Sequence, residues 1–131
     1  MLTDNNSEPP PVFEYFHTGY TPPDLQQVIS LQNLIEVHFR QERDLEFYAG
    51  KMHLTLPRLN NLTRAHLGKT LYELLQDRLH EEAEKLLKHT TLTAKDIAYE
   101  LGMNDPAYFF RCFKRVTGMR PREFRKQARM M

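Results

Sequence analysis

Hydrophobic residues recur at helical spacing along most of this chain. Between residues 21 and 40 the apolar positions fall three or four residues apart, which places them on one face of a helix. Thr21 and Pro22 suit the start of this helix, as its N-cap and its first helical residue. No stretch alternates apolar and polar residues in the manner of a strand, so the pattern predicts an all-α fold of about seven helices. The apolar positions of the first helix are Leu25, Val28, Ile29, Leu31, Leu34, Ile35 and Phe39.

The segment at residues 47–68 is a fainter copy of the segment at residues 97–118. They read FYAGKMHLTLPRLNNLTRAHLG and IAYELGMNDPAYFFRCFKRVTG, with a one-residue insertion in the second copy. Each copy predicts a short helix, a tight turn and a second helix, which is the layout of a helix-turn-helix DNA reader. The matched pairs are Ala49 with Ala98, Met52 with Leu101, Leu54 with Met103, Leu59 with Phe109, Arg64 with Lys114, and Gly68 with Gly118.

Capping residues divide the chain further. Thr70 and Glu73 form a capping box, in which each side chain accepts a backbone N–H at the start of a helix. Gly68 and Gly118 suit the left-handed residue that ends a helix. We therefore expect a first helix-turn-helix at about 44–68, a linking helix at about 70–89, a second helix-turn-helix at about 93–118 and a basic helix at about 120–131. The other predicted N-caps are Asp44, Thr55, Thr93 and Asp105.

The linking helix has a length that suits recognition of two grooves by one chain. At about 1.5 Å per residue, a helix over residues 71–89 is roughly 28 Å long. Successive major grooves on one face of a duplex are about 34 Å apart. Two three-helix units that share this helix also bury more core than either would alone.

The segment from Tyr48 to Arg125 resembles the C-terminal DNA-binding domain of AraC/XylS-type transcriptional regulators. The motifs that carry the resemblance are Ala98-x-x-x-Gly102-Met103, Asp105-Pro-Ala-Tyr-Phe109, Arg111-x-Phe113-Lys-Arg115, Thr117-Gly118, Pro121-x-x-Phe124-Arg125 and, upstream, Arg78-Leu79-x-x-x-Ala83-x-x-Leu86-Leu87. The second half is the more specific match. The resemblance implies a sequence-specific transcription regulator, an activator by family habit, that inserts two recognition helices into successive major grooves.

Positive charge is concentrated where the resemblance places DNA. The whole chain has a net charge of only +1. Residues 1–48 carry 2 basic and 8 acidic side chains, residues 49–104 carry 8 and 7, and residues 105–131 carry 8 and 2. A basic second reader and tail is what phosphate contacts require, although a basic tail also serves solubility.

On the second recognition helix, one apolar stripe is expected to face the core: Phe109, Cys112, Phe113 and Val116. The resemblance places Pro106, Ala107, Phe110 and Arg111 at the major groove and Lys114 near the backbone. Arg111 is the candidate for a bidentate contact to guanine, with a phosphate or carboxylate partner as the alternative. Phe110 stands where the family has a small polar residue, and it either meets a thymine methyl or packs on other protein.

On the first recognition helix, Leu59 and Leu62 are expected to face inward. The residues expected to point outward are Pro57, Asn60, Asn61 and Arg64. Asparagine reads adenine through its N6 and N7 edge, so Asn60 and Asn61 are candidate base readers, or else a solvated polar face. Thr63 replaces the family's aromatic residue here, and this half departs further from the family pattern.

Phosphate contacts are expected from helix N-termini and from basic side chains. The main candidates are Thr55, Arg64, Lys114, Arg115 and Arg120. Weaker candidates are the N-terminus at residues 104–105 and Lys51, Lys69, Lys95, Arg122, Arg125 and Lys126.

Signals for other functions are weak. Six histidines include no pair at metal-ligand spacing, and Cys112 is the only cysteine, so the sequence predicts no metal site, no cofactor and no enzyme. No apolar run reaches membrane-spanning length and no signal peptide is evident, so we expect a cytoplasmic, nucleoid-associated protein that does not contact membranes.

Residues 1–20, with Pro9-Pro10-Pro11, are expected to be disordered or extended. The aromatic stretch at residues 12–20 suggests the lead-in from a missing N-terminal sensor domain, and a stand-alone protein is the alternative. RNA polymerase is an expected partner. A protein-interaction module that contacts the transcription machinery without reading bases remains the rival hypothesis.

Overall fold

The computed structural model describes residues 22–130, and this part of the chain contains seven α-helices and no strand. The predictions for residues 1–20 and for Thr21 as an N-cap lie outside the described residues. The all-α prediction is confirmed. The helices are α2 (Pro23–His38), α3 (Leu45–Lys51), α4 (Leu56–Leu67), α5 (Leu71–His89), α6 (Ala94–Glu100), α7 (Pro106–Thr117) and α8 (Pro121–Arg129).

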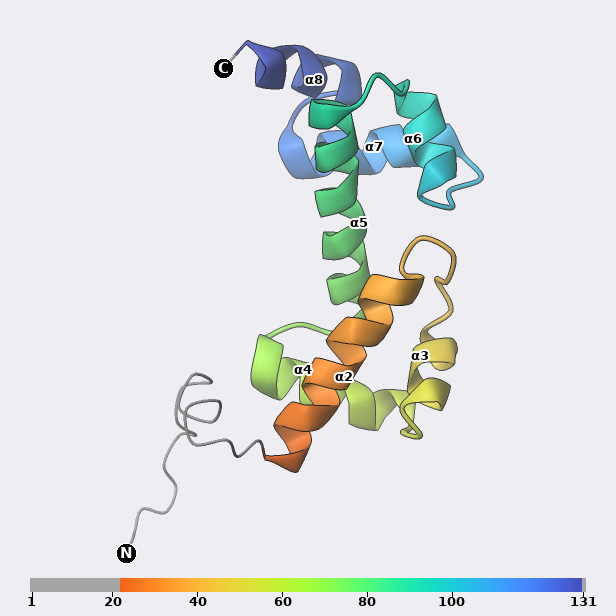
Figure 1. The fold of residues 1–131 in the computed structure, drawn as a ribbon, viewed down its shortest axis with the longest axis vertical. Coiled ribbons are helices and arrows are strands. Elements are labelled where there is room, and N and C mark those ends of the chain that lie inside the picture. Colours follow the sequence, from red (N-terminus) through yellow and green to blue (C-terminus); the bar gives the residue numbers. More distant parts are fainter. Residues whose placement is uncertain (1–21, 131) are drawn as a thin grey trace, which may run out of the picture.

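Helix α5 joins two helical units. Figure 1 shows α2, α3 and α4 around one end of this helix and α6, α7 and α8 around the other. Its buried residues recur every four positions, so a single stripe serves both units. They are Leu71, Leu75, Leu79, Ala83 and Leu87. Each buried leucine of such a stripe contributes about 1.5–3 kcal/mol relative to an exposed one.

The predicted helix caps are present. The Thr55 hydroxyl accepts the N–H of Arg58 at 3.3 Å. The capping box at the start of α5 is complete, with Thr70 N donating to Glu73 at 2.9 Å and Glu73 N donating to the Thr70 hydroxyl at 3.2 Å. Helices α4 and α7 end at glycines in the left-handed region, Gly68 and Gly118. One boundary differs, because α2 begins at Pro23 with Pro22 at the N-cap.

The C-terminal end of α5 is capped by arginines from α8. The Arg125 guanidinium donates to Leu87 O at 2.9 Å and to Thr90 O at 3.2 Å, and Arg129 donates to Thr90 O at 2.6 Å. These carbonyls lack helical partners, and the negative end of the helix dipole favours a cation there. Burial lowers the pKa of Arg125. Arg125 therefore holds α8 against α5, which corrects its inclusion among the phosphate candidates.

An ion-pair network ties α2 to the middle of α5. Arg78 donates to Glu36 at 2.7 and 2.8 Å and to Glu82 at 2.9 Å, and Arg40 pairs with the same Glu82. Hydrogen bonding from Arg78 lowers the pKa of Glu36. Burial alone would raise the pKa of Glu82, but hydrogen bonds from Arg78 and Arg40 lower it on balance. The network fixes α2 along α5 and pairs one carboxylate of the acidic N-terminal segment, that of Glu36, within the fold.

Candidate nucleic-acid interface

Helix α7 presents an outer face that its core residues hold rigidly in place. Phe109 and Phe113 are buried, and Phe113 packs edge-on against Phe124 of α8 with ring centroids 5.3 Å apart. At the N-terminus, the Asp105 carboxylate accepts the N–H of Ala107 at 3.0 Å and Pro106 follows at the first helical position. A helix anchored at both ends and along one side can hold its exposed side chains in a fixed arrangement.

Four of the predicted DNA-contacting residues of the second reader lie together. Phe110, Arg111, Lys114 and Arg120 line one shallow groove between α7 and the start of α8, together with Ala94, Pro121 and Arg122. Phe110 is 37% exposed, and its ring contacts the ring of Phe109 with centroids 5.8 Å apart. The groove therefore combines an apolar surface with several cations, which suits base edges flanked by phosphates.

Arg111 has an additional neighbour on its own helix. Its guanidinium carbon lies 5.9 Å from the centroid of the Tyr108 ring, a cation–π contact one turn back. Within residues 22–130, no ion pair involves Arg111, Lys114, Arg120 or Arg122, in contrast to Arg40 and Arg78. Charges that are not neutralised by neighbouring carboxylates are the ones available to phosphate.

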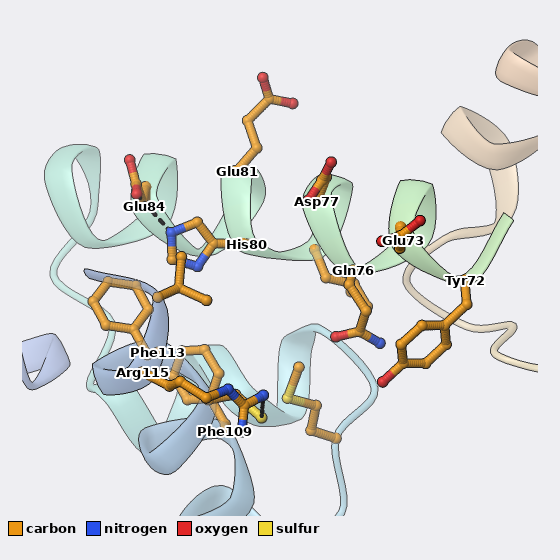
Figure 2. A pocket seen from close by; sticks show the side chains of 14 residues that line it. Tyr72, Glu73, Gln76, Asp77, His80, Glu81, Glu84, Phe109, Phe113 and Arg115 are labelled. Atoms are coloured by element: carbon orange, nitrogen blue, oxygen red, sulfur yellow. Dashed lines mark hydrogen bonds and ion pairs between the residues drawn. The ribbon is translucent and has the colours of Figure 1, made fainter. Parts of the chain in front are cut away.

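Arg115 lies on a different side of α7. It lines a groove that faces α5, where its guanidinium is 3.6 Å from the sulfur of Cys112 (Figure 2). Four acidic residues of α5 line this groove, and Figure 2 shows the Glu81 carboxylate pointing away from Arg115. The structure thus separates Arg115 from the other predicted phosphate contacts. The carboxylates are those of Glu73, Asp77, Glu81 and Glu84.

The same groove corrects the predicted core stripe of α7. Val116 is 63% exposed and Cys112 is partly exposed, and both line the opening between α5 and α7. The ring of His80 covers Phe113 from the α5 side, with centroids 5.1 Å apart. The buried face of α7 therefore narrows to Phe109 and Phe113, while Cys112 and Val116 line the open groove.

Helix α4 has the same general construction in the first unit. Leu59, Leu62 and Thr63 are buried, while Thr55, Pro57, Asn61 and Arg64 are exposed, as expected. Thr63, at the position of Phe113, buries its hydroxyl by donating to Asn60 O at 3.1 Å. A smaller side chain with a satisfied hydroxyl thus replaces the aromatic anchor of the second unit.

The side chain of Asn60 is half-buried and differs from its expected outward orientation. Its amide oxygen accepts the backbone N–H of Leu71, the first residue of α5, at 3.0 Å. This N–H has no partner within its own helix, so Asn60 acts as an additional cap that ties α4 to α5. We therefore exclude Asn60 from the proposed base-reading set.

Comparison with known proteins bears on this two-unit arrangement. A family model described as "Helix-turn-helix domain" matches residues 48–127, which extend from within α3 to within α8 and so include α4, α5, α6 and α7. The chain belongs to the AraC-type helix-turn-helix family of transcriptional regulators. The family membership expected from the sequence motifs is confirmed.

Two relatives illustrate the match. The activator RhaS of Mannheimia succiniciproducens is 33% identical over 91 residues, which are 70% of this chain and 34% of that protein. The arabinose operon regulatory protein of Salmonella typhimurium is 33% identical over 102 residues, 78% of this chain and 34% of that protein. This chain thus matches about a third of the length of each.

Solved structures show the same fold. The C-terminal domain of AraT, a response regulator from Geobacillus stearothermophilus, is 28% identical with a TM-score of 0.73, covering 77% of this chain and 84% of that one. The DNA-binding domain of AdpA, solved in complex with a target DNA, has a TM-score of 0.74 over 79% of this chain and 94% of that one, at 18% identity. These likenesses confirm the pair of helix-turn-helix units joined by a long helix.

Two further observations concern the described part of the chain. Among residues 22–130, none of the helices combines the length and apolar character that crossing a bilayer requires. Nor do the His, Cys, Asp and Glu side chains of these residues gather in threes around a possible metal position.

Proposed function

We propose that this chain is a sequence-specific reader of double-stranded DNA that places α4 and α7 in successive major grooves. The groove formed by Phe110, Arg111, Lys114 and Arg120 carries the proposal, because it joins base-reading and phosphate-binding chemistry on a basic surface. Arg111 is the residue proposed to read guanine, and Phe110 the one proposed to contact an adjacent thymine methyl. Pro106 and Ala107, at the start of the same helix, complete the proposed base-reading surface.

The first reader contributes Pro57 and Asn61 to base contact, with Thr55 and Arg64 at the backbone. Asn61 is exposed on α4, where its amide can pair with adenine. This surface has fewer cations than α7 and α8, so the first unit adds less phosphate-dependent affinity than the second. The two recognition helices therefore contribute unequally to the affinity for DNA.

We also propose that the regulator acts as an activator that contacts RNA polymerase, and that an N-terminal sensor domain accompanies it in the whole protein. It works in the cytoplasm, without catalysis or a cofactor. The similarity to the activator RhaS of Mannheimia succiniciproducens supports the activator role.

Selection of bound duplexes from a random pool at roughly physiological salt tests the proposal. The account predicts enrichment of two short blocks about one helical turn apart, one of which loses its guanine preference with Arg111→Ala. Loss of an Arg–guanine pair should cost about 1–3 kcal/mol on that site. If no sequence is enriched, the chain is not a sequence-specific reader, and the protein-interaction hypothesis takes its place.

A further inference from the structure

The turns of the two helix-turn-helix units share a backbone conformation but differ in their surroundings. Aligned on the repeat, His53 occupies the position of Gly102, and both have positive φ, 57° and 76°. His53 is exposed, so the first turn accepts a large side chain despite its left-handed backbone. The backbone conformation alone therefore does not explain why the second turn has glycine.

Gly102 is in close contact with the end of α2. A Cβ atom at this position would overlap the carbonyl oxygen of Arg40 and would lie 3.3 Å from Nη1 of Arg43. Because the obstacle is backbone, a side chain here can be accommodated only if α2 and the second turn move apart. The glycine thus permits a direct approach between an element of the first unit and the turn of the second.

Arg43 bridges the same two elements. Its guanidinium donates to Leu101 O at the end of α6, and it also lies near Phe39 O at 3.4 Å and Arg40 O at 3.5 Å at the end of α2. Both groups of carbonyls belong to helix C-terminal ends, where a cation is favoured. Burial lowers the pKa of Arg43.

Ion pairs surround this contact. Arg40 pairs with Glu82 of α5 and lies 3.5 Å from Glu100 of α6. Arg78 connects Glu36 of α2 to Glu82 of α5. The C-terminal end of α2 is thus attached both to the linking helix and to the second unit, although α2 itself packs on α3 and α4.

We propose that Arg43 and Gly102 form an inter-unit clamp, a pair of positioning residues that sets the distance and rotation between α4 and α7. The proposal rests on the two-groove reading given above. A single helix between two units leaves bending and twisting free, whereas a second attachment, off the axis of α5, opposes both. The clamp therefore determines which spacing between the two DNA blocks the protein accepts.

The first test needs no DNA. Spin labels are attached at two exposed positions, Ala65→Cys on α4 and Gln127→Cys on α8, in a Cys112→Ala background. The distribution of distances between the two labels is measured by pulsed electron paramagnetic resonance. The intact clamp predicts one narrow distribution. Arg43→Gln and Gly102→Asn should broaden or shift it. An unchanged distribution in both folded variants overturns the clamp, whether or not the chain binds DNA.

A matched control distinguishes loss of the inter-unit contact from a change in turn conformation. His53→Asn places the same residue in the first turn, and asparagine tolerates positive φ, so this variant should leave the distribution unchanged. If His53→Asn broadens the distribution as much as Gly102→Asn does, turn conformation rather than inter-unit contact is responsible and the proposal fails. Arg43→Lys, which retains the charge but cannot reach both helix ends equally, is a milder variant for use if Arg43→Gln does not fold.

The second test compares the selected site with the same site after insertion of one base pair between its blocks. The insertion rotates one block by about 35° relative to the other. The intact chain should bind the inserted site about 10-fold more weakly or worse, and Arg43→Gln should reduce this ratio to about 2-fold. Loss of fold stability lowers binding to both sites equally and leaves the ratio unchanged. A ratio equal to that of the intact chain contradicts the clamp.

Discussion

The amide oxygen of Asn60 accepts the backbone N–H of Leu71 at 3.0 Å, while the adjacent Asn61 is exposed. Two neighbouring asparagines on one recognition helix therefore have different roles. Asn60 connects α4 to the start of the linking helix, and Asn61 remains on the outer face. The pair allows the structural contribution of Asn60 and the proposed DNA contact of Asn61 to be separated with minimal changes in chemistry.

Asn60→Ala should lower the free energy of unfolding by about 1–2 kcal/mol, because it leaves the N–H of Leu71 without this acceptor. Urea unfolding followed by circular dichroism measures the change. The base preference of the variant on selected DNA should match that of the intact chain.

Asn61→Ala should do the opposite. The free energy of unfolding should change by less than about 0.5 kcal/mol, as it does for most substitutions of exposed residues. The base preference of the first block should weaken. Should Asn60→Ala alter base preference while Asn61→Ala does not, the assignment of the two residues is reversed.

Lys114 tests the phosphate side of the interface. Removing one phosphate contact should weaken binding to all sequences alike and reduce the salt slope of log affinity by about 1. Fluorescence anisotropy between low and moderate salt measures this slope for Lys114→Ala. Lys85→Ala, an exposed lysine on α5, is the matched control and should leave the slope unchanged. Equal slopes for Lys114→Ala and the intact chain would exclude a phosphate contact at Lys114.

Arg125 and Arg122 lie three residues apart on α8, and their substitution should affect different properties. The first should affect stability and the second DNA binding. Arg125→Gln removes the cap on Leu87 O and Thr90 O, and it should destabilise the fold by about 1.5–3 kcal/mol, the range for hydrogen bonds that involve charged groups. Arg122→Gln, which lines the basic groove, should leave the unfolding temperature unchanged and weaken DNA binding. Thermal unfolding and anisotropy together distinguish the two residues. A weakening of DNA binding by Arg125→Gln without destabilisation would contradict the capping role.

The network around Glu82 predicts an acid-dependent stability. The folded-state pKa values of Glu36 and Glu82 are lowered, so their stabilisation is fully present above about pH 4.5 and is lost as pH falls through the lowered values. At pH 7, Glu82→Gln should cost about 1–3 kcal/mol. The difference in melting temperature from the intact chain should shrink below pH 4.5. A difference that stays constant down to pH 3 would show that the charge of Glu82 is not what stabilises the fold.

Much of the fold is readable from local patterns. Capping residues such as Thr70 and Asp105 act within a few positions of themselves, so the sequence locates helix ends closely. The internal repeat identifies both recognition helices, because each must bury the same kind of face. The outer positions of α7 follow from the same periodicity.

What could not be predicted depends on contacts between distant segments. Asn60 and Arg125 look like other exposed polar residues until α5 is placed beside them, and a local pattern cannot distinguish a side chain that caps a neighbouring helix from one that faces solvent. Val116 satisfies the spacing of a core residue, but it is exposed in the groove between α5 and α7. Nothing in the sequence around Arg43 indicates its contact with the second unit. In the repeat, however, glycine at position 102 stands where the first copy has His53, and this difference indicates that the second turn has less room for a side chain.

A hydroxyl-radical footprint of the chain on its selected site, with the stoichiometry of the same complex, tests the central claim of two-groove reading most directly. The account predicts two protected segments centred about 10 base pairs apart on one face of the duplex, in a complex of one chain per site. A single protected segment, or two segments that appear only when two chains bind, would contradict it.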